Sequence, residues 1–228
     1  MEIKVLKKVL AANEVVAKTN RELFEKEKVF VVNLMSSPGS GKTSIIERSI
    51  KSLQGKLRTG VIAGDISSTI DADRLSRLNI PIVQINTEPF GGDCHLEASW
   101  VRDAALSLNL KEIDLLFIEN VGNLVCPAEF DTGAHKNVVV VSLPEGEDKP
   151  IKYPLMFRIS QVMLVNKIDL RGVLNIDTDT LLKNARMVNP DLEIFQVSAL
   201  TGAGFDEWID WLLREGTALD IYNFLDKI

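Results

Sequence analysis

Cysteine is scarce in this sequence. Cys94 and Cys126 are its only two cysteines, too few for the disulfide framework of a small secreted domain. They predict a cytoplasmic protein whose thiols are free or bind a metal. The 228 residues carry 26 Lys and Arg against 32 Asp and Glu, with no basic run, which disfavours nucleic acid as the main partner.

Long apolar runs are absent as well. No stretch reaches the roughly 18 to 20 consecutive apolar residues of a membrane span, so we expect no membrane partner. The N-terminus also lacks the apolar run and cleavage site of a signal peptide. Residues 1–28 instead carry charges throughout, with apolar residues at helical spacing, namely Val5, Val9, Ala12, Val16 and Leu23. This pattern predicts an N-terminal amphipathic helix that packs on the domain, with recruitment of a partner as the alternative.

Internal repeats, low-complexity tracts and linkers are also missing, which predicts one domain over residues 1–228, with residues 29–228 as its main body. Short runs rich in β-branched residues predict buried strands at Val29–Met35, Val61–Asp65, Ile82–Asn86, Leu115–Glu119, Val138–Leu143, Val162–Asn166 and Glu193–Ser198. Helical patterns lie between most of them, at Thr43–Leu53, Cys94–Leu108, Asp177–Met187 and Phe205–Arg214. This alternation predicts an α/β fold with a mainly parallel sheet covered by helices on both faces.

A phosphate-binding motif follows the first predicted strand. Residues 36–43 (SSPGSGKT) match the P-loop pattern G-x-x-x-x-G-K-S/T, except that Ser36 replaces the first glycine. The two glycines of the loop would let backbone amides curl round a phosphate at the start of the next helix. Lys42 would reach the β- and γ-phosphates, and the Thr43 hydroxyl would hold Mg²⁺. The residues expected to contact the nucleotide here are Gly39, Ser40, Gly41, Lys42, Thr43 and Ser44.

Two of the predicted strands end in acidic residues, Asp65 and Glu119. An acid at a strand tip beside a P-loop binds Mg²⁺ directly or through water. Asp65, Glu119 and Thr43 therefore form a predicted magnesium site, although a solvated strand end is the alternative for each carboxylate. Gly122 lies where small GTPases sense the γ-phosphate.

The choice of base is indicated by Asn166-Lys167-Ile168-Asp169, an N-K-x-D pattern at the end of a predicted strand. The Asp169 carboxylate would accept hydrogen bonds from guanine N1–H and the exocyclic amine, a pair of donors that adenine lacks. Ser198-Ala199-Leu200 follows another strand and resembles the S-A-x loop that backs guanine in GTPases. The order of these motifs predicts GTP and GDP as ligands.

Both cysteines and one of the two histidines form a further group. Cys94-His95 and Cys126 would rise from the nucleotide-facing edge of the sheet and could meet there. Thiolate and imidazole suit Zn²⁺ or Ni²⁺, whereas ordinary packed thiols are the alternative. Three such ligands fall short of a closed tetrahedral site, so a water or a second chain would complete it. The other histidine, His135, has no identifiable partner and is predicted to be exposed.

Together these motifs resemble the HypB family of nickel-incorporation GTPases, which belongs to the SIMIBI class of P-loop GTPases. The resemblance covers roughly residues 30 to 205 and rests on residues 37–43, 64–65, 94–96, 119–127, 146–150, 152–154 and 166–170. It implies a homodimer, promoted by GTP and metal, that delivers nickel to the hydrogenase large subunit during maturation of nickel–iron hydrogenase, with a HypA-type nickel accessory protein. It also implies that Cys94, His95 and Cys126 bind Zn²⁺ or Ni²⁺.

The resemblance further implies that residues 66–74 form the first switch, in which Asp71 orients water or Mg²⁺; a helix N-cap is the alternative for this residue. Lys42, Asp71 and Gly122 are then the expected catalytic residues, and turnover should be slow because no arginine finger is evident. Two family features are missing: the C-x-x-C-G-C or His-rich nickel tract of some members, and the additional P-loop lysine of some SIMIBI relatives, where Ser37 and Pro38 stand.

Three other functions are compatible with parts of this pattern. A P-loop small-molecule kinase would leave the N-K-I-D segment unexplained. A related chaperone GTPase for urease or a cobalamin mutase fits less well, because the E-N-V-G-N-L-V-C-P run favours hydrogenase. A zinc-dependent structural dimer with a vestigial nucleotide site conflicts with the intact Lys42, Thr43 and Asp169.

Overall fold

Strands and helices alternate along the chain in the computed structural model, which describes residues 4–173 and 176–221. The strands are β1 (Phe30–Ser36), β2 (Thr59–Asp65), β3 (Ile82–Asn86), β4 (Leu115–Glu119), β5 (Lys136–Ser142), β6 (Val162–Asn166) and β7 (Glu193–Gln196). The helices are α1 (Lys4–Lys26), α2 (Lys42–Leu53), α3 (Ile70–Ser76), α4 (Ala98–Ser107), α5 (Lys149–Lys152), α6 (Pro154–Ile159), α7 (Thr178–Val188) and α8 (Phe205–Ala218). None of these helices combines the length and apolar composition that crossing a bilayer requires.

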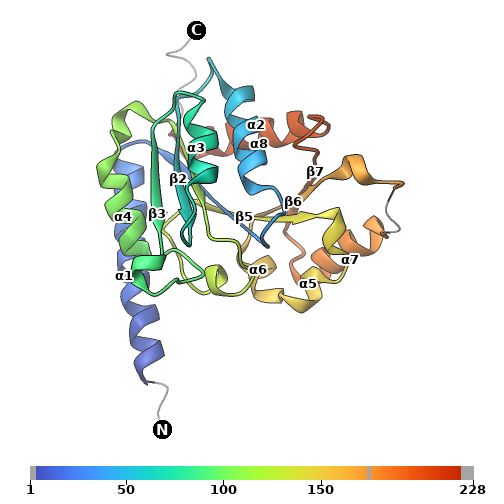
Figure 1. Cartoon of the computed structure of the whole chain (residues 1–228), viewed down its shortest axis with the longest axis horizontal. Helices are drawn as coiled ribbons and strands as arrows, with labels where there is room; N and C mark the ends of the chain where they lie inside the picture. The colour runs from blue at the N-terminus through green and yellow to red at the C-terminus, as the bar shows by residue number, and fades with distance from the viewer. Residues whose placement is uncertain (1–3, 174–175, 222–228) are drawn as a thin grey trace.

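All seven strands pair in parallel, in the order β3-β2-β4-β1-β5-β6-β7. Adjacent residues of β1 face opposite sides of the sheet, as the pleat requires: Val32 packs with α2, α3 and α8, whereas Val31 packs with α1 and α4. Near the end of the same strand Met35 packs with α6 and α7. Figure 1 shows α1 and α4 side by side on one flank and α5, α6 and α7 gathered at the other. The predicted α/β fold with helices on both faces is confirmed.

The strand order explains how the predicted motifs meet. Because every strand runs the same way, all their carboxyl ends lie at one edge. The P-loop follows β1, Glu119 ends the neighbouring β4, and Asp65 ends β2 beside it. Beyond β5, on the other side of β1, β6 ends in Asn166 and β7 leads to Ser198. The phosphate motifs and the base motifs thus flank the P-loop on opposite sides.

The sequence pattern predicted the bounds of three strands correctly, but it placed the start of one helix four residues too early. The strands Ile82–Asn86, Leu115–Glu119 and Val162–Asn166 are confirmed as predicted. The helix predicted over Cys94–Leu108 begins only at Ala98. Residues 94–97 form a loop, in which the Leu96 N–H donates to the Asn120 side chain.

The N-terminal helix exists, but only part of its predicted apolar face is buried: Val16 and Leu23 are half-buried, and Leu23 packs against the core. α1 spans Lys4–Lys26, and residues 1–3 lie outside the described residues. Ala12 is exposed and Val9 is 43% exposed, whereas the face toward the sheet carries Asn13, Ala17, Asn20 and Phe24, all buried. The two asparagines are buried because their amides bond to backbone groups near α4: Asn13 Oδ1 accepts from Ala98 N (2.8 Å), and Asn20 Nδ2 donates to Ala98 O (2.8 Å) and Thr132 O (3.0 Å).

The prediction that His135 is exposed and unpartnered is also wrong. Its Nδ1 accepts from Val31 N (3.0 Å), while its own backbone N–H donates to Val31 O (3.0 Å). The ring lies against Phe24 and Phe30, with centroid distances of 6.4 and 5.9 Å. His135 therefore extends the pairing between β1 and the start of β5 with its side chain.

Candidate nucleotide and metal site

The loop between β1 and α2 has the backbone of a phosphate-binding loop. Gly39 (φ +76°) and Gly41 (φ +98°) adopt left-handed conformations, and a β-carbon at Gly41 would lie 2.4 Å from Asn166 Nδ2. Lys42 is buried, and its Nζ donates to Ser36 Oγ (2.9 Å). Ser36, which departs from the motif, thus supplies a partner for the lysine. Burial lowers the pKa of Lys42, opposed by nearby carboxylates.

The predicted magnesium ligands line one cavity of about 410 Å³ beside this loop. Thr43 Oγ1 donates to Glu119 Oε1 (2.6 Å), whereas Glu119 Oε2 is buried with no hydrogen-bond partner among the described residues. Burial raises the pKa of Glu119 to about 7, against the Thr43 hydrogen bond and the Lys42 charge. Asp65 Oδ1 accepts from the backbone N–H groups of residues 67 and 68. A hydroxyl and two carboxylates, one with an unsatisfied oxygen, fit an oxygen-preferring cation such as Mg²⁺.

The same cavity contains the other predicted phosphate-site residues. Asp71 lines it from the first turn of α3, where Thr69 occupies the N-cap position, so the N-cap alternative for Asp71 is wrong. Gly122 lines it from the segment after β4, and a β-carbon there would lie 3.1 Å from Pro38 Cα. The segment after Glu119 therefore lies directly against the P-loop.

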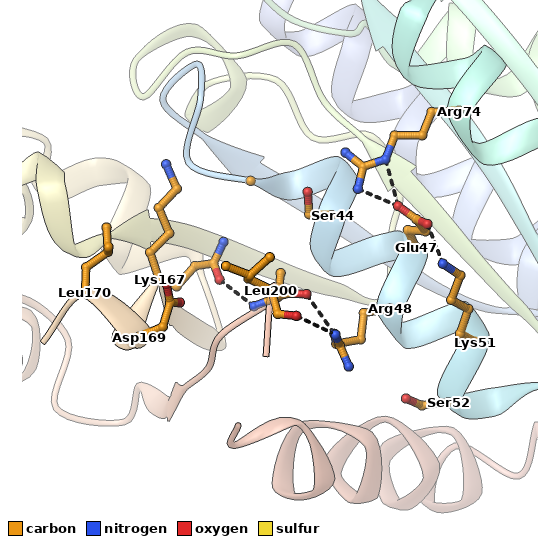
Figure 2. Close-up of a pocket in the computed structure, with 13 residues that line it drawn as sticks. Ser44, Glu47, Arg48, Lys51, Ser52, Arg74, Lys167, Asp169, Leu170 and Leu200 are labelled. Carbon is orange, nitrogen blue, oxygen red and sulfur yellow. Dashed lines mark hydrogen bonds and ion pairs between the residues drawn. The ribbon is translucent and has the colours of Figure 1, made fainter. Parts of the chain in front are cut away.

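A second cavity, of about 530 Å³, is lined by all the residues predicted to bind the base except Ser198, which is buried beside Asp169 (Figure 2). Asn166 joins its walls, because Nδ2 donates to Ser40 O (2.8 Å) and Oδ1 accepts from Ala199 N (3.1 Å). Lys167 Nζ donates to Gly39 O (2.8 Å). Asp169 accepts from Ser198 Oγ, and Leu200, which is 79% exposed, lies at the rim. The two sequence motifs and the P-loop thus form one hydrogen-bonded pocket.

Several residues of these cavities escaped the sequence analysis. In Figure 2 the exposed face of α2 forms one wall of the larger cavity: Arg48 donates to Ala199 O and Leu200 O (2.8 and 2.9 Å), and Glu47 pairs with Lys51 and with Arg74 of α3. Arg74 lines both cavities. The helical spacing of polar residues after Thr43 could have indicated this wall.

A missed carboxylate also touches the P-loop. Glu145 Oε1 accepts from Ser40 Oγ (2.6 Å) and from Ser142 Oγ (2.8 Å), which fixes the turn after β5 against the phosphate loop. Glu145 comes directly before the G-E-D-K-P run that the sequence analysis noted only as a point of resemblance. Its position beside that run was the one available signal.

Cys94, His95 and Cys126 meet, with ligand atoms within 4.8 Å of one another. The two Sγ atoms are 2.6 Å apart, and neither ring nitrogen of His95 has a hydrogen-bond partner among the described residues. The ring stacks on Phe130 with a centroid distance of 3.7 Å. Burial lowers the pKa of His95, which favours the neutral imidazole that metals bind. Burial and the Cys94 thiol raise the pKa of Cys126 to about 11, so a metal would displace its proton. Two thiols and an unsatisfied imidazole fit a borderline-soft divalent metal.

Comparison with known proteins identifies the family. Residues 30–196 match the family described as CobW/HypB/UreG, nucleotide-binding domain. Over 204 residues the chain is 47% identical to the hydrogenase maturation factor HypB of Escherichia coli strain K12. The aligned region covers 90% of this chain and 69% of that protein. The chain belongs to the HypB family. Its P-loop and its Cys/His cluster both lie within the matched nucleotide-binding domain.

Solved structures of HypB proteins have the same fold. The crystal structure from Archaeoglobus fulgidus matches with a TM-score of 0.83 at 37% identity, covering 90% of this chain and 99% of that one. HypB from Helicobacter pylori, crystallised in complex with nickel, matches with a TM-score of 0.85 at 36% identity, covering 91% and 96%. The expected resemblance to HypB GTPases is confirmed at the level of family and fold.

Proposed function

We propose that this protein hydrolyses GTP and delivers nickel during the maturation of nickel–iron hydrogenase. The observation that carries the proposal is the Cys94, His95 and Cys126 cluster, two thiols and an unsatisfied imidazole within 4.8 Å. Cys126 lies on the segment that leaves Glu119, in the phosphate cavity, and passes Gly122 against the P-loop. The relatives are named as hydrogenase maturation factors, and one of them was crystallised with nickel.

The nucleotide roles follow from the two cavities. Lys42 neutralises the β- and γ-phosphates. Thr43, Asp65 and Glu119 would hold Mg²⁺, which would stabilise charge that develops on the phosphates. Asp71 orients the attacking water, and the Gly122 N–H contacts the γ-phosphate. Asp169 accepts from guanine within the pocket framed by Asn166, Lys167 and residues 199–200.

The metal would be held by Cys94, His95 and Cys126, and three ligands leave one position of a tetrahedral site open. In a homodimer promoted by GTP and metal, a second copy of this chain can fill that position near a two-fold axis. Nickel is the cargo, received from or passed to a HypA-type accessory protein and then the hydrogenase large subunit. Zinc competes for the same ligands, since tetrahedral thiolate sites suit it.

Metal titration of the apo-protein tests this proposal. Ni²⁺ and Zn²⁺ are titrated into protein loaded with GDP or with a non-hydrolysable GTP analogue, and GTP and ATP hydrolysis are measured on the same preparation. We expect stoichiometric metal binding that depends on Cys94, and GTP turnover well below about 1 s⁻¹ with no comparable ATP turnover. Equal hydrolysis of ATP, or metal binding that persists in Cys94→Ala, would contradict the proposal.

A further inference from the structure

Three asparagine side chains form a hydrogen-bonded chain across the centre of the sheet. Asn120, directly after β4, donates from Nδ2 to Asn33 Oδ1 of β1 (3.2 Å). Asn33 in turn donates from Nδ2 to Asn137 Oδ1 of β5 (3.0 Å). The chain follows the strand order β4-β1-β5, and on β1 it lies between Val31, which belongs to the α1/α4 core, and Met35, which belongs to the α6/α7 core.

This position is unfavourable for amides unless every polar atom is paired. Asn120 is fully buried and Asn33 is 1% exposed. An amide in such an environment loses its water partners, and apolar side chains of similar volume fill a core without that cost. The hydrogen bonds offset the desolvation, but they do not explain why a sheet of Val, Ile and Leu holds amides at this point.

The three hydrogen-bonded asparagines hold a pair of backbone N–H groups in place. Asn120 Oδ1 accepts from Leu96 N (3.2 Å) and from Val121 N (3.0 Å). Leu96 directly follows His95 of the metal cluster, and Val121 lies between Glu119 and Gly122 of the phosphate cavity. One carbonyl oxygen therefore joins the two segments that form the metal cluster.

A second contact ties the same metal-bearing segment to β2. A β-carbon on Gly64 would lie 2.7 Å from Leu96 Cδ1, so the Leu96 side chain packs onto the backbone beside Asp65. The Leu96 amide is thus fixed by Asn120 on one side, and the Leu96 side chain is fixed by the end of β2 on the other. Both anchors belong to segments that line the phosphate cavity.

We propose that Asn120 is a positioning residue through which the nucleotide state changes the affinity of the Cys94, His95 and Cys126 cluster, and that Asn33 orients the Asn120 amide for this role. The inference rests on the proposed function. Ligands in the phosphate cavity act on the segment that starts at Glu119. Because Leu96 and Val121 share one acceptor, that segment cannot move alone without leaving a buried N–H unpaired. Cys94 and His95 therefore move with it.

Variants of Asn33 separate this role from a general effect on folding, because Asn33 lies in neither the nucleotide cavity nor the metal cluster. Asn33→Leu keeps an apolar core of similar volume but removes the acceptor of Asn120 Nδ2. Asn33→Asp keeps that acceptor, and the Asn137 amide can turn to donate to the new carboxylate. Asn120→Ala removes the shared acceptor itself.

Asn189→Asp is the matched control. Asn189 Nδ2 donates to two backbone carbonyls, those of Phe157 and Ser160 (both 2.9 Å), and it precedes β7, the edge strand three positions from β1. It therefore disturbs a comparable amide without touching either site.

The measurement is the Ni²⁺ dissociation constant, obtained by competition with a chromophoric chelator, for protein saturated with GDP and with a non-hydrolysable GTP analogue. The ratio of the two constants is the coupling factor, for which couplings of about 5- to 150-fold are typical. We expect a ratio in this range for the wild type, Asn33→Asp and Asn189→Asp, and a ratio within about twofold of unity for Asn33→Leu and Asn120→Ala. The affinity for the guanine nucleotide in the absence of metal should stay close to the wild-type value in both Asn33 variants and in Asn189→Asp, whose side chains lie outside the phosphate cavity.

The outcomes separate the inference from the proposed function. Wild-type protein that binds Ni²⁺ and hydrolyses GTP but shows a ratio of one leaves the proposed function in place and overturns the coupling. A folded Asn33→Leu that keeps the wild-type ratio overturns the role of the amide chain, and it decides the matter even where Asn120→Ala does not fold. Loss of the ratio in a folded Asn33→Asp, which keeps both the shape of the side chain and the acceptor of Asn120 Nδ2, shows that this hydrogen bond does not set the coupling, which also overturns it.

Discussion

His135 should make folding stability fall as the pH drops through the range in which a free histidine titrates. The ring is partly buried and accepts the Val31 N–H at Nδ1 (3.0 Å), a bond that the imidazolium cannot accept. Burial, and then the charges of Arg21 on α1 and Lys136 on β5, lower its pKa to about 4. In the unfolded chain the pKa returns to about 6.5.

The sign follows from proton binding. Between about pH 6.5 and about pH 4 the unfolded chain binds a proton at His135 that the folded protein does not, so stability decreases as the pH falls. The contribution is complete above about pH 6.5 and is lost as the pH passes through the folded-state pKa. At roughly 1.4 kcal/mol per pH unit, this interval corresponds to about 3 kcal/mol, which partial exposure of the ring reduces to about 2 kcal/mol. That is a large part of a typical stability of about 5–15 kcal/mol.

Urea unfolding of the wild type and of His135→Asn, at several values between about pH 7.5 and about pH 4.5, measures this contribution. The asparagine Oδ1 can take the place of Nδ1 as acceptor for the Val31 N–H, but it does not titrate. The smaller side chain packs less well on Phe24 and Phe30, which lowers the free energy of unfolding by the same amount at every pH. The titration of the carboxylates affects both proteins equally, so it cancels in the difference between their unfolding free energies. Toward low pH, the free energy of unfolding of the wild type should fall by about 2 kcal/mol relative to that of His135→Asn. Parallel pH profiles would refute the reasoning.

Three further outcomes are expected from the site. Asp169→Asn should weaken GTP binding by about 100-fold or more and favour xanthosine nucleotides, measured by competition binding; unchanged base preference would contradict the role of the carboxylate. Lys42→Ala should lower GTP turnover by about 100- to 1,000-fold, measured by phosphate release, and a rate near wild type would remove the lysine from the mechanism. Cys94→Ala should abolish Ni²⁺ and Zn²⁺ binding and weaken the GTP-analogue dimer in sedimentation velocity while GTP binding persists. A protein that binds metal tightly yet stays monomeric in every nucleotide state would rule out a bridged site.

The P-loop and the N-K-x-D segment were predictable because their chemistry depends on neighbouring residues. Gly41 must be glycine because its φ is +98° and a β-carbon there would lie 2.4 Å from Asn166 Nδ2. No sequence motif predicts the order of the strands in the sheet. Parallel pairing places every strand end at one edge, and the order β2-β4-β1 then brings the ends of these three strands together. The sequence therefore predicted that Asp65 and Glu119 lie at the same edge as the P-loop, but the adjacency of their strands had to come from the structure.

The failures share a different cause, which is polar groups whose partners are remote in sequence. Asn13 and Asn20 broke the predicted apolar stripe of α1 because they bond to backbone groups 78 to 118 residues away. His135 was assigned to solvent, yet it pairs with Val31, 104 residues earlier. A periodicity argument places polar side chains outside the core unless a motif explains them, so contacts of this kind escape it.

The same remote contacts explain why the metal-bearing segment is a loop instead of the first turn of α4. Ala98, the first residue of α4, has both backbone groups bound by α1: its N–H donates to Asn13 and its C=O accepts from Asn20. Two residues earlier the Leu96 N–H is bound by Asn120. A helix extending to Cys94 would take the Ala98 N–H away from Asn13 and would turn Cys94 and His95 to different faces, about 100° apart. With Leu96 and Ala98 held in this way, the preceding loop brings Cys94 and His95 to Cys126, with ligand atoms within 4.8 Å of one another.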